Sequence, residues 1–118
     1  LDEVCNRVVE AIKPVGFGIL TRIDFDKKIK EKTGNEINPC VILGACNPNL
    51  AYQAYARSSD TALLIPCNIV LTEVRPGEIR VEAMRPTRML EFLSGSESFP
   101  QAKNAEKDLQ RALDGMVK

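Results

Sequence analysis

The protein has 118 residues and a mass of 13.1 kDa, which is the length of one domain with its own core. Sixteen lysines and arginines balance sixteen acidic residues. A formal charge of zero excludes a strongly basic nucleic-acid binder and an acidic disordered tail, so we expect no nucleic-acid partner. Histidine is absent, which excludes Ser-His-Asp and Cys-His catalysis and removes the commonest metal ligand.

The sequence contains no apolar run of about 18 residues, so we expect neither a transmembrane helix nor a membrane partner. Its N-terminus lacks the basic-then-apolar order of a signal peptide. Four cysteines, at positions 5, 40, 46 and 67, form no C-x-x-C pair. We therefore expect a cytoplasmic protein whose thiols are free.

Apolar periodicity and turn residues predict four elements in the first part of the chain. Residues 1–13 carry apolar side chains at helical spacing and are predicted as a helix. Residues 17–25 alternate loosely and predict a strand, and a short helix that ends at Gly34 is expected to follow. The continuous apolar run at residues 40–46 is typical of a strand that is covered on both faces.

The next part of the chain predicts a helix, a long strand and a hairpin. Asn47 and Pro48 are favoured residues for the start of a helix. Four of the helix side chains are expected to face inward: Leu50, Ala51, Ala54 and Tyr55. Residues 61–75 form the longest strand candidate, in which Pro66 requires a bulge, an edge or a break. The turn residues that follow predict a hairpin with a last strand at 79–84.

The C-terminal part of the chain predicts helices. Pro86 can open a helix that carries three apolar residues, Met89, Leu90 and Leu93. A flexible connector is expected at residues 94–98, and a last helix at 100–117. Its apolar stripe has helical spacing and consists of Ala102, Ala105, Leu109, Ala112 and Met116.

Strands and helices in this order do not alternate strictly, which favours an α+β fold over a doubly wound one. We expect a single α+β domain over residues 1–118. Its sheet is expected to be mainly antiparallel, with about four strands and with helices packed on one face.

A repeated Cys-Asn dipeptide is the most unusual feature of the sequence. Cys46-Asn47 stands at a predicted strand-to-helix junction, and Cys67-Asn68 follows the proline that interrupts the long strand. The positive end of the helix dipole next to Cys46 favours a thiolate, so we expect a lowered pKa for that thiol. If the two strands are neighbours, the two thiols could face each other.

Such thiols can serve as nucleophiles, redox sensors or ligands for a soft metal. A zinc site would need three or four ligands, for which the sequence shows no paired spacing, whereas Cu(I) would need only Cys46 and Cys67. The structural interpretation stays open beside these functions. Cys67 lies in the apolar parity of its strand and Asn47 is explained as a helix cap, while Cys5 and Cys40 are expected in the core.

Three runs of residues carry a resemblance to a known family. Residues 41–48, 50–52 and 63–70, with their ILGACNP and LIPCN motifs, resemble the domain-of-unknown-function 302 family. Residues 16–18 and 28–34 are also similar to that family. The resemblance covers about residues 1–85 and leaves the C-terminal helices at 86–118 outside it.

The resemblance implies a compact α+β fold of β-α-β(4)-α type and a homodimer. Members usually carry a strand before the first helix, and none is visible before Leu1, so we expect either further residues upstream or a smaller sheet. The resemblance implies no activity, because the family's biochemical role is unassigned. For this protein we expect no required cofactor, with a soft metal ion as the possible ligand. By motif match, its candidate functional positions are Cys46, Asn47, Cys67 and Asn68.

Three functions remain open for these positions. The first is a binding module for a small ligand or a soft metal ion, with Cys46 and Cys67 as ligands. The second is a thiol-dependent redox enzyme or sensor, in which Cys46 attacks and Cys67 resolves. The third is a dimeric interaction domain whose Cys-Asn motifs serve only the fold. We favour the binding module because the sequence shows no acid–base partner for turnover.

Overall fold

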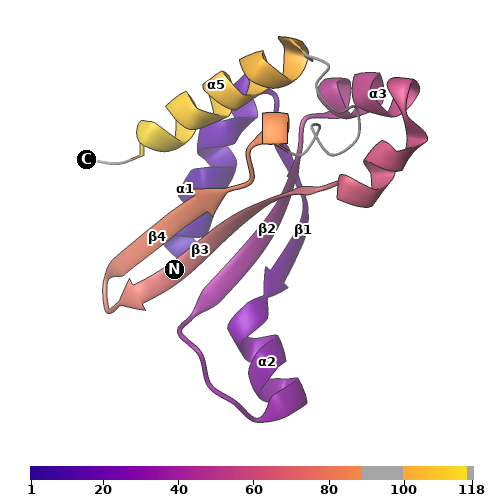
Figure 1. Ribbon diagram of the computed structural model, residues 1–118. Helices are drawn as coiled ribbons and strands as arrows, with labels where there is room; N and C mark the ends of the chain where they lie inside the picture. The colour runs from indigo at the N-terminus through magenta and orange to yellow at the C-terminus, as the bar shows by residue number, and fades with distance from the viewer. Residues whose placement is uncertain (89–99, 117–118) are drawn as a thin grey trace.

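The computed structural model describes residues 1–88 and 100–116, which form a four-stranded antiparallel sheet with helices (Figure 1). The strands, which are neighbours in chain order, are β1 (Gly18–Asp24), β2 (Cys40–Cys46), β3 (Cys67–Arg75) and β4 (Glu78–Ala83). The α-helices are α1 (Asp2–Ile12), α2 (Phe25–Thr33), α3 (Pro48–Arg57) and α5 (Pro100–Asp114). Two short 3-10 helices are η1 (Lys13–Val15) and η2 (Ser59–Leu64). The predicted α+β fold is confirmed.

One face of the sheet packs against α1 and α5, which also contact each other (Figure 1). The strand period of two and the helix period of about 3.6 bring the apolar side chains of these elements into one layer. Its buried residues from the strands are Val41, Leu43, Ala45, Ile69 and Leu71. Those from the helices are Cys5, Val8, Ile12, Ala105 and Leu109. The core position predicted for Cys5 is therefore confirmed.

A row of paired apolar side chains crosses the other face of the sheet. Ile23 pairs with Ile42, and Ile42 pairs with Val70, so all three lie on the face opposite Leu43. Ile42 and Val70 are only partly buried, and Ile23 is 43% exposed. The prediction that the strand at residues 40–46 is covered on both faces is thus wrong at Ile42, which is only partly buried.

Residues 61–66 do not form a strand, in contrast to the sequence prediction. Residues 59–64 form η2 instead, in which the N–H of Thr61 donates to the carbonyl of Ser58, and the Ile65–Pro66 peptide bond is cis. Proline has no N–H to give to a sheet ladder, so pairing begins only at Cys67, opposite Ala45. The break expected at Pro66 is real, and the strand lies entirely after it.

Fewer side chains of helix α3 face the interior than the sequence predicts. Leu50 and Ala54 pack with Ala102 of α5, whereas Tyr55 is 52% exposed. The inward position predicted for Tyr55 is therefore wrong. The helix stop predicted at Gly34 is confirmed, because Gly34 has a positive φ of 78° and its N–H donates to the carbonyl of Lys30.

Part of the C-terminal prediction lies outside the described residues. This applies to the predicted helix positions Met89, Leu90 and Leu93 and to the connector at 94–98. Helix α5 itself is present, with Ala102, Ala105 and Leu109 buried as expected. Within the part of the chain that the structure describes, no helix is both long and apolar enough to span a bilayer.

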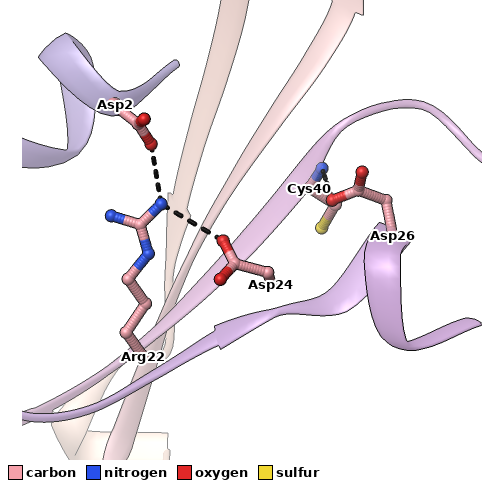
Figure 2. A network of polar contacts seen from close by, with 5 residues as sticks. All are labelled: Asp2, Arg22, Asp24, Asp26 and Cys40. Atoms are coloured by element: carbon pink, nitrogen blue, oxygen red, sulfur yellow. Dashed lines mark hydrogen bonds and ion pairs between the residues drawn. The ribbon is translucent and has the colours of Figure 1, made fainter. Parts of the chain in front are cut away.

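Polar contacts fix the end of the sheet next to α2 (Figure 2). The Arg22 Nη2 donates to Asp2 Oδ1 at 2.7 Å and to Asp24 Oδ1 at 3.2 Å, which ties the start of α1 to β1. Asp26 Oδ1 accepts from the backbone N–H of Cys40 at 3.0 Å and ties α2 to β2. Cys40 is buried at this end, far along β2 from Cys46.

A carboxylate on α5 fixes the segment after β4. Glu106 accepts hydrogen bonds from the Thr87 hydroxyl at 2.6 Å, from the Thr87 N–H at 3.2 Å and from Arg85 Nη2 at 3.0 Å. Burial opposes the ionisation of Glu106, but the hydrogen bonds from Thr87 and Arg85 outweigh it and hold the pKa of this carboxyl below its ordinary value. The ionised form of Glu106 therefore stabilises the fold.

Candidate functional site

The two cysteines of the Cys-Asn motifs lie at the same end of the sheet, beside α3 (Figure 1). Strand β2 ends at Cys46 and β3 begins at Cys67, and Cys67 pairs with Ala45. Strict alternation along a ladder would direct Cys46 and Cys67 to opposite faces. Both nevertheless line one cavity, because each is the terminal residue of its strand, where the ladder ends.

This cavity is small and apolar. Its volume is about 30 Å³, which is the space of about one water molecule and far below the roughly 300–1,000 Å³ of drug-sized sites. The apolar lining residues are Phe17, Ala45, Leu50, Ala51, Ala54, Ile65 and Pro86. Cys46, Asn47, Thr61 and Cys67 complete the lining. The size limits an occupant to a single ion or a group of very few atoms.

Burial favours the neutral form of both thiols. Burial raises the pKa of the Cys46 thiol. Burial, together with the charge that Cys46 would carry nearby, raises the pKa of Cys67 to about 11. The lowered pKa expected for Cys46 from the helix dipole is therefore wrong, because the thiol is partly buried among apolar side chains. A raised pKa argues against either thiol as an activated nucleophile.

Asn47 acts as the N-cap of α3, as predicted. Its Oδ1 accepts from the N–H of Leu50 at 3.2 Å, and its carbonyl accepts from the N–H of Ala51 at 2.9 Å. A Cβ added at Gly16 would lie 3.4 Å from Asn47 Nδ2, so the chain at Gly16 passes close to the Asn47 side chain. Asn47 thereby positions the first turn of α3 as one wall of the cavity.

Asn68 is not part of the cavity. It pairs with Gly44, on the face of the sheet opposite Cys67, and its side chain is exposed. Its carbonyl accepts from the N–H of Met84. The structure thus brings together Cys46, Asn47 and Cys67, and it separates the fourth candidate from them.

Gly44 lets the Pro66 segment approach β2 closely. A Cβ at this position would lie 2.6 Å from Pro66 Cγ and closer still to Thr21 Oγ1. Such distances are shorter than van der Waals contact, so any larger residue would displace Pro66 or Thr21. Because Pro66 directly precedes Cys67, the missing side chain at Gly44 lets the chain come close to β2 just before the second cysteine.

Thr61 is a cavity residue that the sequence prediction missed. Its side chain is 2% exposed, and its hydroxyl has no hydrogen-bond partner among the described residues. A buried polar group without a partner costs about 1–3 kcal/mol. The only signal in the sequence is a lone hydroxyl in the apolar stretch 61–66. That signal is weak because threonine is also common in strands.

Residues 1–88 and 100–116 contain no group of three or more Cys, Asp or Glu side chains that could hold a metal ion. Within these ranges, Cys46 and Cys67 are the lining residues of the cavity that carry a soft sulfur donor. Two soft donors suit a metal ion that accepts two-coordinate binding.

Comparisons with known proteins agree with this fold. The sequence of residues 1–116 matches the family described as "Domain of unknown function DUF302". A solved structure of an uncharacterized conserved DUF302 protein from Bacillus stearothermophilus is similar, with a TM-score of 0.78 and 27% identity. The alignment covers 96% of this chain and 88% of that chain. No curated protein matches the sequence. The chain, from its first helix through α5, therefore belongs to the DUF302 family, whose function is unknown.

Proposed function

We propose that this chain is a small binding module that holds a soft monovalent metal ion, such as Cu(I), between the thiols of Cys46 and Cys67. The observation that carries the proposal is the convergence of two cysteines from different strands on one cavity of about 30 Å³. A bare ion fits this volume, whereas a metabolite of ordinary size does not.

The donor set supports a two-coordinate ion. Thiolates are soft ligands that select Cu(I) over hard cations. Binding replaces two S–H bonds by two Cu–S bonds and releases two protons, which leaves a complex with one net negative charge. The raised pKa of Cys67, at about 11, means that the ion must displace this proton, so affinity should rise with pH.

A competition titration tests the proposal. Reduced protein is titrated anaerobically with Cu(I) against bathocuproine disulfonate, and Zn(II), a borderline ion that prefers four ligands, is used as the comparison. Wild type should bind one Cu(I), and Cys46→Ala and Cys67→Ala should each lose most of the affinity. Cys5→Ala and Cys40→Ala are the matched controls, since both residues are buried away from the cavity. Equal binding by all four variants would contradict the proposal.

The same convergence of thiols favours a second function, a thiol–disulfide pair. Two thiols would form one disulfide, releasing two protons and passing two electrons to an oxidant such as glutathione disulfide. Incubation with glutathione disulfide followed by mass spectrometry tests this alternative. A Cys46–Cys67 disulfide in a protein that does not bind Cu(I) would favour the redox function.

The row formed by Ile23, Ile42 and Val70 favours self-association as a third function. A homodimer would remove these partly exposed side chains from water. Sedimentation equilibrium should then give a dimer for wild type and a monomer for Ile23→Lys. Ile37→Lys is the matched control, because Ile37 is 44% exposed but lies outside the row. A monomeric wild type would contradict this function.

A further inference from the structure

Thr61 lines the cavity that Cys46 and Cys67 share, and its buried hydroxyl has no hydrogen-bond partner among the described residues. Most buried polar groups in folded proteins are hydrogen-bonded, so each exception needs a physical reason. Among the described residues, none accepts a hydrogen bond from this hydroxyl. The thiols that share the cavity are neutral, and a neutral sulfur is a weak acceptor.

We propose that Thr61 donates a hydrogen bond to the thiolate that forms when the cavity takes its metal ion. This inference rests on the proposed function and adds a third residue to the site, one that sets affinity without touching the metal. Thr61 thus acts on the metal ion only through the thiolate to which it donates, as a positioning residue.

The charge of the loaded site supports this role. A bis-thiolate complex of a monovalent ion carries one net negative charge, and burying a charge among apolar groups is costly unless it is hydrogen-bonded. Among the described residues that line the cavity there is no lysine or arginine. A thiolate is a charged acceptor, and hydrogen bonds to charged groups are roughly twice as strong as neutral ones. The Thr61 hydroxyl, which has no partner among the described residues, would therefore gain one when the metal ion binds.

The fold holds Thr61 in place for this contact. Its backbone N–H donates to the Ser58 carbonyl at 3.1 Å within η2, and η2 packs against α3. Helix α3 begins directly after Cys46 and Asn47. Thr61 and Cys46 are therefore both held in place by their connection to α3.

Two substitutions at one position test the inference. Thr61→Val keeps the branched shape and removes the hydroxyl, whereas Thr61→Ser keeps the hydroxyl. In the Cu(I) competition titration, Thr61→Val should bind about 10–100-fold more weakly than wild type, and Thr61→Ser should recover most of the affinity. The metal-free Thr61→Val protein should unfold at a urea concentration no lower than wild type, which a merely structural role of the hydroxyl would not allow.

The outcomes separate the two proposals. If wild type binds Cu(I) through both cysteines and Thr61→Val binds equally well, the inference is wrong and the proposed function stands. If wild type binds no more tightly than Cys46→Ala, both the inference and the proposed function are wrong.

A measurement on the wild-type protein tests the inference even if a Thr61 variant does not fold. In the Cu(I)-loaded protein, the Thr61 hydroxyl proton should exchange slowly by NMR, and fast exchange would refute the hydrogen bond.

Discussion

Replacing Thr61 by valine should stabilise the metal-free protein, which is unusual for a substitution at a position that is only 2% exposed. The substitution removes a hydroxyl without a partner, whose burial costs about 1–3 kcal/mol. It also buries one further methyl group, worth up to about 0.8 kcal/mol. Part of this gain is lost where the larger methyl group packs tightly. We expect the free energy of unfolding to rise by about 1–2 kcal/mol and the melting temperature by about 5 °C.

Urea denaturation followed by far-UV circular dichroism measures this change, and the m-value should stay constant. Thr87→Val is the matched control, because the Thr87 hydroxyl donates to Glu106 at 2.6 Å. Its loss should lower the free energy of unfolding by about 1 kcal/mol. If Thr61→Val destabilised the protein as much as Thr87→Val, the Thr61 hydroxyl would have a partner in solution and the reasoning would be refuted.

Three further predictions concern residues that hold the site and its surroundings. Glu106→Gln should lower the free energy of unfolding by about 1–2 kcal/mol at pH 7 in urea titrations. Because the folded pKa of Glu106 is lowered, this difference should shrink as the pH falls below the ordinary carboxyl value of 4.5, and a constant difference would contradict the assignment. Gly44→Ala should cost about 1–3 kcal/mol by the same assay, because its Cβ would overlap Pro66, and a neutral effect would show that the segment is free to move. Asn47→Ala should cost about 1 kcal/mol through the lost cap, with Asn47→Asp recovering most of it, and equal loss in both variants would argue against capping.

Features that depend on neighbouring residues in the chain could be predicted from the sequence. Helix α1 (Asp2–Ile12) lies within the predicted range 1–13, because its apolar spacing fits one helical face. The Gly34 stop and the Asn47 cap are likewise decided by one or two residues. Residues 61–66 were predicted wrongly because short apolar runs fit a strand and a buried turn equally well.

Features of the site that depend on tertiary packing could not be predicted in the same way. The pKa of Cys46 is raised by burial, and this burial comes from segments far away in sequence. The separation of Asn68 from Cys67 follows from strand alternation once the register at Ala45 is known. Thr61 was missed because the absence of a hydrogen-bond partner is a property of the whole surroundings.

Protection of individual thiols by the metal tests the central claim most directly. The folded protein, with and without one equivalent of Cu(I), is treated with a small alkylating reagent, and each cysteine is quantified by mass spectrometry. We predict that Cu(I) protects Cys46 and Cys67 together, while the slow alkylation of buried Cys5 and Cys40 stays unchanged. Protection of only one of the two cavity cysteines, or of neither, would contradict a shared thiolate site.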